Sequence, residues 1–306
     1  MALKPSRNKT IRLEKKQISS LVCSSLKLKT TASFEDIVNK IIWQDSLSAM
    51  DKMPDKCVDL MVVDPPYNLT KNFGTSTFRE MSNDDYSKWL DKWLKKTARI
   101  LKDNASIYIC ADWKTSIAIP YIASKYFVLQ NRISWEREKG RGAQNNWKNC
   151  LEDIWFFTKS KDYKFYLDRV KVLREVIAPY RNVEGAPKDW FEKGNKKMRL
   201  THPSNIWTDI SVPFWSMAEN TDHPTQKPEK LIAKLILASS DEGDVVFDPF
   251  LGSGTTAVVA KKLNRKFIGI EKEKEYVALA LTRLEMANEN PQIQGFEDGV
   301  FKPRNM

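Results

Sequence analysis

The stretch Val245-Val246-Phe247-Asp248-Pro249-Phe250-Leu251-Gly252-Ser253-Gly254-Thr255-Thr256 decides the fold of this chain. It is typical of a short buried strand, a glycine-rich turn and the start of a helix, which we expect to run from Ala257 to Leu263. The next expected strand, 266–271, ends in the carboxylate of Glu271. This order predicts a βαβ unit of an α/β fold, with a ligand at the carboxyl ends of its strands.

The predicted βαβ unit favours a nucleoside as its ligand. Gly252 and Gly254 let the backbone approach a ligand closely, and Glu271 can accept hydrogen bonds from both hydroxyls of a ribose. A phosphate-binding P-loop is excluded, because the chain has no Gly-Lys-Ser/Thr triplet. The dinucleotide pattern G-x-G-x-x-G is incomplete, since Ala257 stands at the third glycine position. One nucleoside without a pyrophosphate therefore fits better.

A second motif, Asp64-Pro65-Pro66-Tyr67, follows the apolar run Leu60 to Val63. Two prolines fix φ twice and remove two N–H donors, so they predict a stiff turn at the end of a buried strand. The Asp64 carboxylate and the Pro65 carbonyl suit the two protons of a flat amine, and the Tyr67 ring suits stacking on it. The alternative is a purely structural Asp-Pro turn with a packed tyrosine.

Composition limits the class of protein. The 306 residues carry a net charge of +11, and 42% of them are hydrophobic, as in a soluble globular protein. The positive charge favours a polyanionic partner, and ten tryptophans among many Lys and Arg suit stacking on bases. Four dispersed cysteines and two histidines make a structural zinc site or a disulfide framework unexpected. No apolar run of about 18 residues occurs, so the cytoplasm is the expected compartment.

The pattern of the chain suggests five parts. They are a basic, solvated N-terminal arm (1–40), a catalytic half (41–160), a target-recognition segment (161–221), a cofactor-binding half (222–290) and a loose C-terminal tail (291–306). Segment 161–221 is rich in aromatic and basic residues, is broken by prolines and shows no clean period, so we expect an irregular insertion. The polar stretch 68–81 is expected to be a loop long enough for a mobile lid.

The loop 136–148 is a candidate for contact with a polyanion. Its glycines, cations and amides lack an apolar period, and such side chains contact phosphates and base edges. We therefore take residues in and beside this loop, together with Tyr67, as substrate-binding candidates: Trp135, Arg137, Lys139, Arg141, Asn146 and Lys148.

Three motifs in this order resemble the exocyclic-amino DNA methyltransferases. They are Asp64-Pro-Pro-Tyr67, His223-Pro-Thr-Gln-Lys-Pro228 and Asp248-Pro-Phe-Leu-Gly-Ser-Gly-Thr-Thr256. The order is similar to the β-class permutation found in restriction-modification enzymes, and the resemblance covers residues 40–285. It implies a Rossmann-like fold with permuted motifs, a mixed sheet with helices on both faces, and S-adenosylmethionine as the methyl donor.

The resemblance also implies roles for individual residues. Asp64, Pro65, Pro66 and Tyr67 would be catalytic, with Asp64 also beside the cofactor. The other cofactor-binding residues would be Asp45, His223, Thr225, Gln226, Lys227, Asp248, Phe250, Gly252, Ser253, Gly254, Thr255, Thr256 and Glu271. Asp45 departs from the family pattern, because Gln44 precedes it where the family usually has Gly. From the residues alone, Asp45 is equally well explained as a helix cap.

The implied reaction is transfer of a methyl group to the amino nitrogen of a base flipped out of duplex DNA. The leading Asp of the motif favours adenine N6, with cytosine N4 as the alternative because cytosine enzymes more often carry Ser. Methylation of cytosine carbon 5 is disfavoured by the absence of a Pro-Cys pair. A non-catalytic DNA-binding module and an RNA substrate are further alternatives. The resemblance raises a homodimer and a cognate restriction endonuclease as partners, with the protein near the nucleoid.

Overall fold

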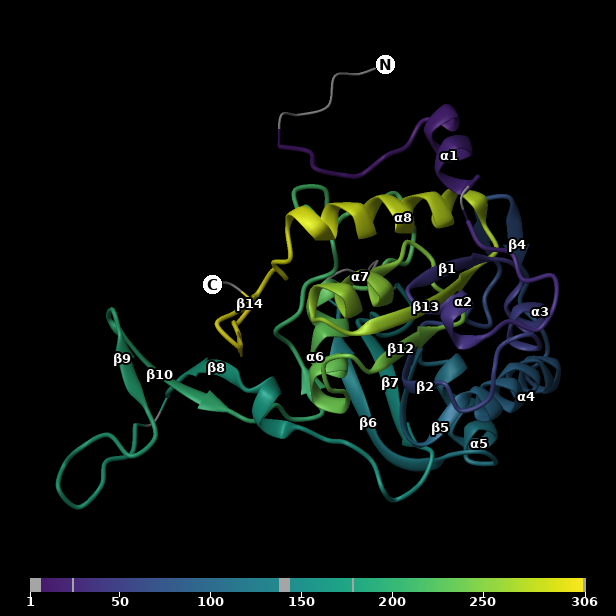
Figure 1. Cartoon of the computed structure of the whole chain (residues 1–306). Helices are drawn as coiled ribbons and strands as arrows, with labels where there is room; N and C mark the ends of the chain where they lie inside the picture. The colour runs from purple at the N-terminus through teal and green to yellow at the C-terminus, as the bar shows by residue number, and fades with distance from the viewer. Residues whose placement is uncertain (1–6, 24, 138–143, 178, 305–306) are drawn as a thin grey trace.

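An eight-stranded mixed sheet forms the centre of the protein (Figure 1). We describe it from a computed structural model, which covers residues 7–23, 25–137, 144–177 and 179–304. The strand order is β1-β13-β12-β2-β5-β7-β6-β11. Neighbouring strands are parallel except at β7, which runs antiparallel to both β5 and β6. The mixed α/β sheet and the permuted order of its strands confirm the predicted fold class.

The bounds of the elements are as follows. The strands of the large sheet are β1 (Lys40–Trp43), β2 (Val58–Val63), β5 (Leu101–Ala111), β6 (Val128–Glu136), β7 (Leu151–Thr158), β11 (Ile206–Trp207), β12 (Val245–Asp248) and β13 (Lys266–Glu271). The helices are α1 (Lys15–Val22), α2 (Phe34–Ile37), α3 (Ser46–Met50), α4 (Asn83–Ile100), η1 (Thr115–Ile117), α5 (Ile119–Ala123), η2 (Leu167–Val170), α6 (Glu229–Ser239), α7 (Thr255–Lys262) and α8 (Lys274–Glu289). The remaining strands are β3 (Lys71–Phe73), β4 (Ser76–Phe78), β8 (Val172–Glu175), β9 (Phe191–Lys193), β10 (Lys196–Thr201), β14 (Phe296–Glu297) and β15 (Val300–Phe301).

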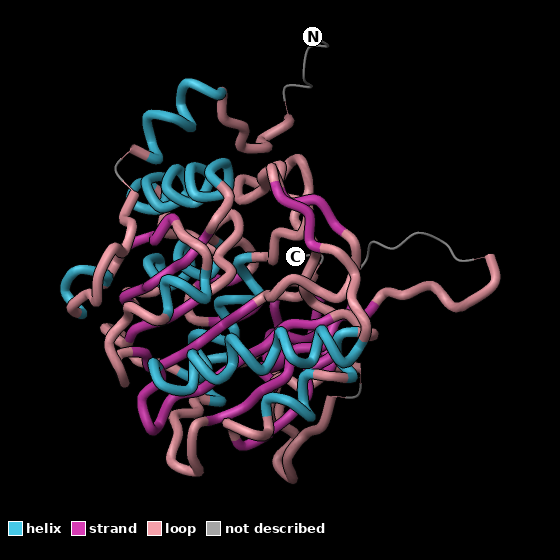
Figure 2. Tube along the Cα trace, turned by 90° about the vertical axis from the view of Figure 1, so that its right-hand side faces the viewer, coloured by secondary structure: helices cyan, strands magenta, loops and turns pink. Residues whose placement is uncertain are grey.

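Helices cover both faces of the large sheet, as Figure 2 shows for the strands in magenta and the helices in cyan. Alternate residues of β2 point to opposite faces because side chains in a strand have a period of two. Leu60 and Val62 enter the core under α6, α7 and α8. Met61 and Val63 enter the core under α3, α4 and α5. All eleven residues of α6 are buried, which explains why its sequence is so apolar.

The topology gathers several polar strand ends at one edge of the sheet. β12 pairs in parallel with β13 on one side and with β2 on the other. The chain leaves β12 through α7 and leaves β2 toward α4, which lie on opposite faces of the sheet. Such a switch point opens a crevice at the carboxyl ends of the strands. Asp64, Asp248 and Glu271 all lie at this edge.

Four stretches are more ordered than the sequence predicted. Stretch 68–81, expected to be a loop, contains the β3–β4 hairpin. Segment 161–221 contributes β8, β9 and β10 to a second sheet, and the C-terminal tail adds β14 and β15 to it. The N-terminal arm also departs from the solvated arm that we expected, because α1 packs against α8 and Val22 is buried. These contacts join distant parts of the chain, and no local period signals them.

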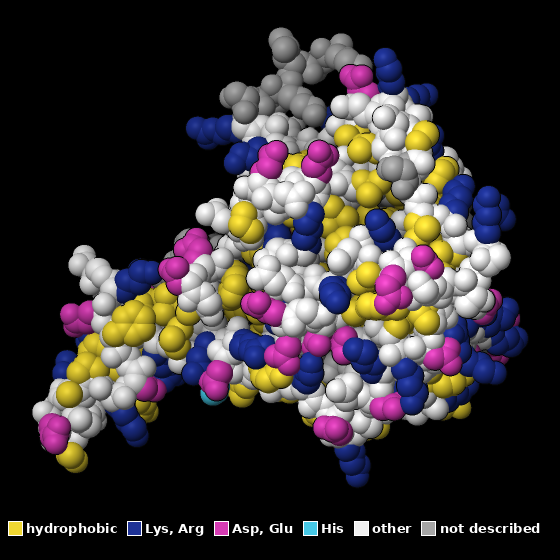
Figure 3. All heavy atoms as spheres, in the orientation of Figure 1, with side chains coloured by type: hydrophobic (Ala, Val, Ile, Leu, Met, Phe, Trp, Pro, Cys, Tyr) yellow, Lys and Arg dark blue, Asp and Glu magenta, His cyan; other side chains and the backbone are white. Residues whose placement is uncertain are grey.

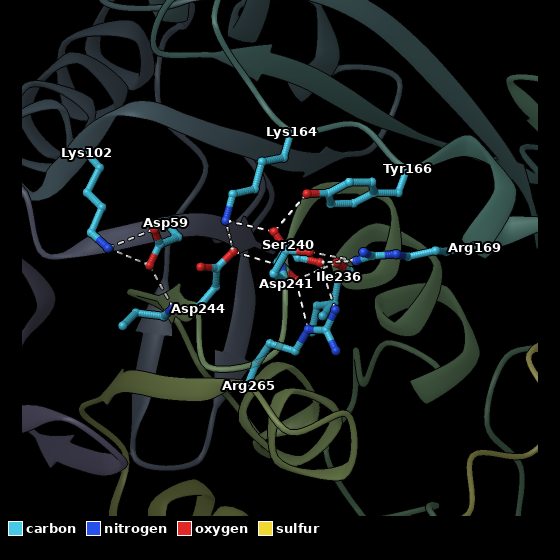
Figure 4. Close-up of polar contacts among 11 residues, drawn as sticks. Asp59, Lys102, Lys164, Tyr166, Arg169, Ile236, Ser240, Asp241, Asp244 and Arg265 are labelled. Carbon is cyan, nitrogen blue, oxygen red and sulfur yellow. Dashed lines mark hydrogen bonds and ion pairs between the residues drawn. The ribbon is translucent and has the colours of Figure 1, made fainter.

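The second sheet extends away from the body as an arm, with β9 and β10 at its far end (Figure 1). Polar contacts hold the base of this arm to the loop after α6 (Figure 4). Tyr166 donates a hydrogen bond to Asp241 at 2.7 Å, and Arg169 contacts the same carboxylate at 3.0 Å. Lys164 bridges Asp241 and Asp244 at 3.1 and 2.6 Å. The arm therefore leaves the body from a fixed root.

Among the described residues, no helix is both long and apolar enough to cross a lipid bilayer. No group of three or more His, Cys, Asp or Glu side chains suited to a metal ion occurs in the described part of the chain either.

Candidate active site

The Asp64 turn is held rigidly at the end of β2. Pro65 is buried, and the carbonyl of Pro66 accepts a hydrogen bond from the Tyr86 hydroxyl at 2.9 Å. The side chain of Asn68 both donates to and accepts from the backbone of Met81, at 3.0 and 2.8 Å. Since the prolines offer no N–H groups, these contacts from α4 and the following loop fix the turn instead.

The carboxylate of Asp64 is already hydrogen-bonded on both oxygens. Oδ1 accepts from the Tyr67 hydroxyl at 2.7 Å, and Oδ2 accepts from the Lys227 ammonium at 2.7 Å. The same ammonium lies 3.2 Å from Oε2 of Glu152. Burial lowers the pKa of Lys227, but Asp64 and Glu152 outweigh that effect and raise it above its ordinary value. Lys227 is therefore a buried cation between two carboxylates.

The glycine turn has a geometry that only glycine meets without strain. Gly252 and Gly254 have φ of +55° and +88°, in the left-handed region. A Cβ on Gly254 would lie 2.6 Å from the Cβ of Ala280, and one on Gly252 would lie 2.9 Å from the ring of His223. Gly254 lets α7 approach α8, and Gly252 brings backbone close to the cavity.

Asp248 braces the glycine turn from within. Its carboxylate accepts hydrogen bonds from the Phe250 backbone N–H at 3.0 Å and from the Thr256 hydroxyl at 2.7 Å. Burial raises the pKa of Asp248 to about 7 despite these two bonds. The ring of Phe250 packs between Trp89 and Trp93 of α4, with ring centroids 5.7 and 5.6 Å away. The turn is thus clamped between a carboxylate below and aromatic rings beside it.

Glu271 and Asp45 lie at the tips of neighbouring strands β13 and β1. Glu271 accepts hydrogen bonds from the backbone N–H groups of Gly252 and Glu273 at 2.8 and 2.7 Å, and burial raises its pKa. Asp45 caps α3 by accepting from the N–H of Ser48 at 3.1 Å. Each carboxylate oxygen has more than one acceptor position, so these bonds leave room for ligand hydroxyls. Both side chains line the cavity, and the capping role of Asp45 is also present.

The segment 223–227 brings side chains to the other wall of the cavity. The His223 ring packs against Tyr276 with centroids 4.3 Å apart, and burial lowers its pKa to about 3. His223 is therefore neutral at physiological pH. The carbonyl oxygen of Gln226 accepts from the N–H and hydroxyl of Thr221 at 3.0 and 2.7 Å, so this side chain orders the segment. Thr225 lines the cavity.

One cavity of about 210 Å³ joins the two predicted motifs. Of the predicted catalytic and cofactor residues, it is lined by Asp45, Asp64, Pro65, Pro66, Tyr67, His223, Thr225, Gln226, Lys227, Asp248, Phe250, Gly252, Ser253, Thr255, Thr256 and Glu271. Gly254 alone of that set lies behind the wall, where it packs against α8. Residues more than 180 positions apart therefore face one space, as the motif order implied.

The predicted DNA-contacting residues are more scattered. Trp135 is only 1% exposed and donates its indole N–H to the carbonyl of Ile210 at 3.0 Å, so the prediction that it contacts DNA is wrong. Its position in β6 turns the ring into the core instead of the loop surface. Arg137 pairs with Glu152 beside the cavity. Asn146 and Lys148 are exposed, while Lys139 and Arg141 lie outside the described residues.

Sequence reasoning missed three residues that support the site. Glu152 reaches the cavity edge because β7 is antiparallel, so its first residues meet the last residues of β5. Arg283 of α8 donates to the Ser253 carbonyl at 3.0 Å and to the Thr255 hydroxyl at 2.9 Å. Lys71 of the β3–β4 hairpin lines the cavity, and its pKa is lowered by burial. A carboxylate at the start of an apolar strand was the one available signal, at Glu152.

Comparison with known proteins agrees with this geometry. A family profile for N6 and N4 methyltransferases, described as DNA methylase, matches residues 58–282. The chain belongs to this DNA methylase family. The type II methyltransferase M.HpaI of Haemophilus parainfluenzae is 35% identical to this methylase over 255 residues, 80% of this chain and 74% of that protein.

Two further proteins place this methylase within the family. The DNA adenine methyltransferase YhdJ of Escherichia coli (strain K12) is 35% identical over 262 residues, 83% of this chain and 85% of that protein. The solved structure of the PvuII DNA methyltransferase, described as cytosine-N4-specific, shares the fold with a TM-score of 0.58 and 19% identity. That match covers 83% of this methylase and 87% of the PvuII chain.

The cofactor of this methylase is S-adenosylmethionine. The residues present fit this group. A Cβ at Gly252 would fill the space beside His223, so the turn is open only because it is glycine. Glu271 and Asp45 supply carboxylates at one end of the cavity, and Asp64 lies at the other. The glycine turn, Glu271 and Asp45 would therefore hold the nucleoside part, and 223–227 would line the methionine end.

Proposed function

We propose that this methylase transfers a methyl group to the N6 amino group of a flipped adenine in duplex DNA. The observation that carries the proposal is the single cavity that joins Asp64 and Tyr67 to the glycine turn. Two features support adenine: the motif begins with Asp64, and one relative of 35% identity is described as a DNA adenine methyltransferase. A target amine inside a base stack is unreachable, so the base has to be extruded first.

The proposed chemistry rests on making a poor nucleophile reactive. The lone pair of an aryl amine is delocalised into its ring. Hydrogen bonds from its two protons to the Asp64 carboxylate and the Pro65 carbonyl pull the nitrogen toward sp³ and localise that pair. The same acceptors stabilise the positive charge that develops on nitrogen. S-adenosylmethionine supplies the electrophilic methyl group, and Tyr67 stacks on the base so that the amine is in line.

Cytosine N4 is the second candidate target. It is favoured by the likeness in fold to a cytosine-N4-specific enzyme, although a likeness of fold does not select a base. The deciding experiment is to incubate unmethylated genomic DNA with the protein and S-adenosylmethionine, then sequence it with modified bases called. We expect N6-methyladenine within one short recognition sequence. N4-methylcytosine as the sole product would overturn the choice of base, and RNA as the only acceptor would overturn the choice of polymer.

Asp64→Ala tests the catalytic role of the opening carboxylate. We expect methyl transfer to fall by at least about a thousandfold, since one preorganised charged contact in a transition state contributes several kcal/mol. Binding of S-adenosylmethionine, measured by calorimetry, should stay within a few-fold of wild type. Substantial residual transfer at saturating DNA would contradict the role of Asp64.

We also propose that the arm and loop 136–148 read the DNA sequence. The arm carries exposed hydrophobic side chains beside Lys and Arg (Figure 3), including Ile177, Tyr180, Val183 and Phe191. Exposed rings and cations suit contact with bases and phosphates. A partner endonuclease that cuts the same site is proposed from the type II relative. A homodimer, and a place near the nucleoid in the cytoplasm, complete the proposal.

A further inference from the structure

The arrangement around Asp64 poses a difficulty for the proposed chemistry. The target amine needs an oxygen of the Asp64 carboxylate, yet both oxygens are occupied, by Tyr67 and by Lys227. The Lys227 ammonium lies 2.7 Å from Oδ2, the distance at which an amine donor would also sit. A cation binds a carboxylate more strongly than a neutral amine does. Lys227 therefore competes with the substrate for Asp64.

A second carboxylate stands ready beside Lys227. Oε2 of Glu152 is 3.2 Å from the ammonium, and the Glu152 side chain is only 6% exposed. Its other oxygen, Oε1, is bound by Arg137, which fixes the orientation of the carboxylate. Glu152 is also 3.5 Å from the Tyr67 hydroxyl. A buried cation needs a counter-charge wherever it goes, and Glu152 provides one within a short movement of Lys227.

We propose that Glu152 is a positioning residue for methyl transfer. In the free enzyme Lys227 stands on Asp64 in place of the target amine. When the flipped base enters, Lys227 shifts onto Glu152 and frees Oδ2 of Asp64. The ion pair thus keeps the empty site ordered and neutral without blocking it. This inference rests on the proposed function, because it concerns the amine that Asp64 receives.

Glu152→Gln tests the proposal by removing the charge while keeping the shape. Lys227 then has Asp64 as its one nearby carboxylate and stays there. The base enters after DNA has bound, so we expect kcat to fall at least tenfold. The Kd values for DNA and S-adenosylmethionine should change less than twofold. An unchanged kcat in a folded Glu152→Gln variant would overturn the proposal. Glu152→Asp, which keeps the charge, should retain more activity than Glu152→Gln.

The double variant Glu152→Gln/Lys227→Met gives the decisive comparison. Without the competing ammonium, Glu152 has nothing to position, so the double variant should match Lys227→Met in kcat within about twofold. It should also exceed Glu152→Gln severalfold. A purely structural Glu152 predicts the opposite, a further loss in the double variant. Replacing both members of a buried pair by neutral groups is tolerated better than removing one, so this comparison holds even where Glu152→Gln alone unfolds.

The two ways of failing are distinguishable. If wild-type protein transfers no methyl group to any DNA, the proposed function itself fails. If wild-type protein is active but kcat in the Lys227→Met background still depends on Glu152 as strongly as in wild type, only the positioning role fails.

Discussion

At the residue scale, Gly254 shows how one missing side chain shapes the cofactor turn. It has φ of +88°, and a Cβ would meet the backbone of Ala280 at 2.8 Å. We expect Gly254→Ala to destabilise the protein by about 2–4 kcal/mol, from left-handed strain plus overpacking. Binding of S-adenosylmethionine should weaken with it. Chemical unfolding and calorimetric titration measure the two effects.

Gly243→Ala is the matched control for that substitution. Gly243 has a similar φ of +83°, but no atom lies within 4 Å of the added Cβ. It should therefore cost only the backbone strain, about 1 kcal/mol, and leave cofactor binding unchanged. Equal losses in the two variants would mean that the contact between α7 and α8 is unimportant at Gly254.

Single residues also show how far sequence reasoning reaches. Asp64, Tyr67 and the glycines were predicted correctly to share one cavity, because each belongs to a local motif at a strand end. Lys227 was predicted to line the methionine end, and the structure places it on Asp64 as well. The two residues are 163 positions apart. Only the packing of α6 beside β2 brings them together, and no local pattern encodes that contact.

At the element scale, α8 supports the cofactor turn through Arg283. This buried guanidinium donates to Ser253 and Thr255 and pairs with Glu229 of α6 at 2.9 Å. Arg283→Met leaves the Ser253 carbonyl and the Thr255 hydroxyl without this donor. We expect the Kd for S-adenosylmethionine to rise about tenfold, and the melting temperature to fall, since breaking a buried pair costs about 3–5 kcal/mol.

Lys262→Met separates the two effects of Arg283. Lys262 pairs with the other oxygen of Glu229 at 2.8 Å from α7 but makes no contact with Ser253 or Thr255. Its loss should lower stability while cofactor affinity stays close to wild type. If both variants weaken S-adenosylmethionine binding equally, Arg283 acts through stability alone.

Elements with a strong local signal were predicted, and those built on distant pairing were not. The β12–turn–α7–β13 unit has an apolar strand, a glycine turn and a tipped carboxylate within 27 residues of sequence (245–271). β10, in contrast, has only one buried residue, Met198, so its pattern carries no clean alternation. It forms because β8 and β9 pair with it. The second sheet was therefore beyond what the sequence pattern could show.

At the scale of the whole molecule, a rigid body and a projecting arm divide the work. The cavity lies at the edge of the large sheet, and the arm extends from the opposite end of the molecule to α4 (Figure 1). The ion pairs at Asp241 and Asp244 fix the root of the arm to the loop after α6. A surface held at a set distance from the cavity suits contact with DNA on either side of a flipped base.

The arm's role is tested by neutralising its cations. Lys193 is exposed at the end of β9, and Lys197 of β10 lies 5.1 Å from the Trp190 ring. If both contact phosphates, Lys193→Ala/Lys197→Ala should weaken DNA binding and flatten the log–log dependence of affinity on salt by about 2, one unit for each contact. Affinity for S-adenosylmethionine should not change. The matched control is Lys92→Ala/Lys95→Ala on α4, at the far end of the molecule, where both lysines are exposed. The control removes the same net charge, so equal losses in the two variants would reduce the arm's contribution to long-range attraction and contradict direct contact.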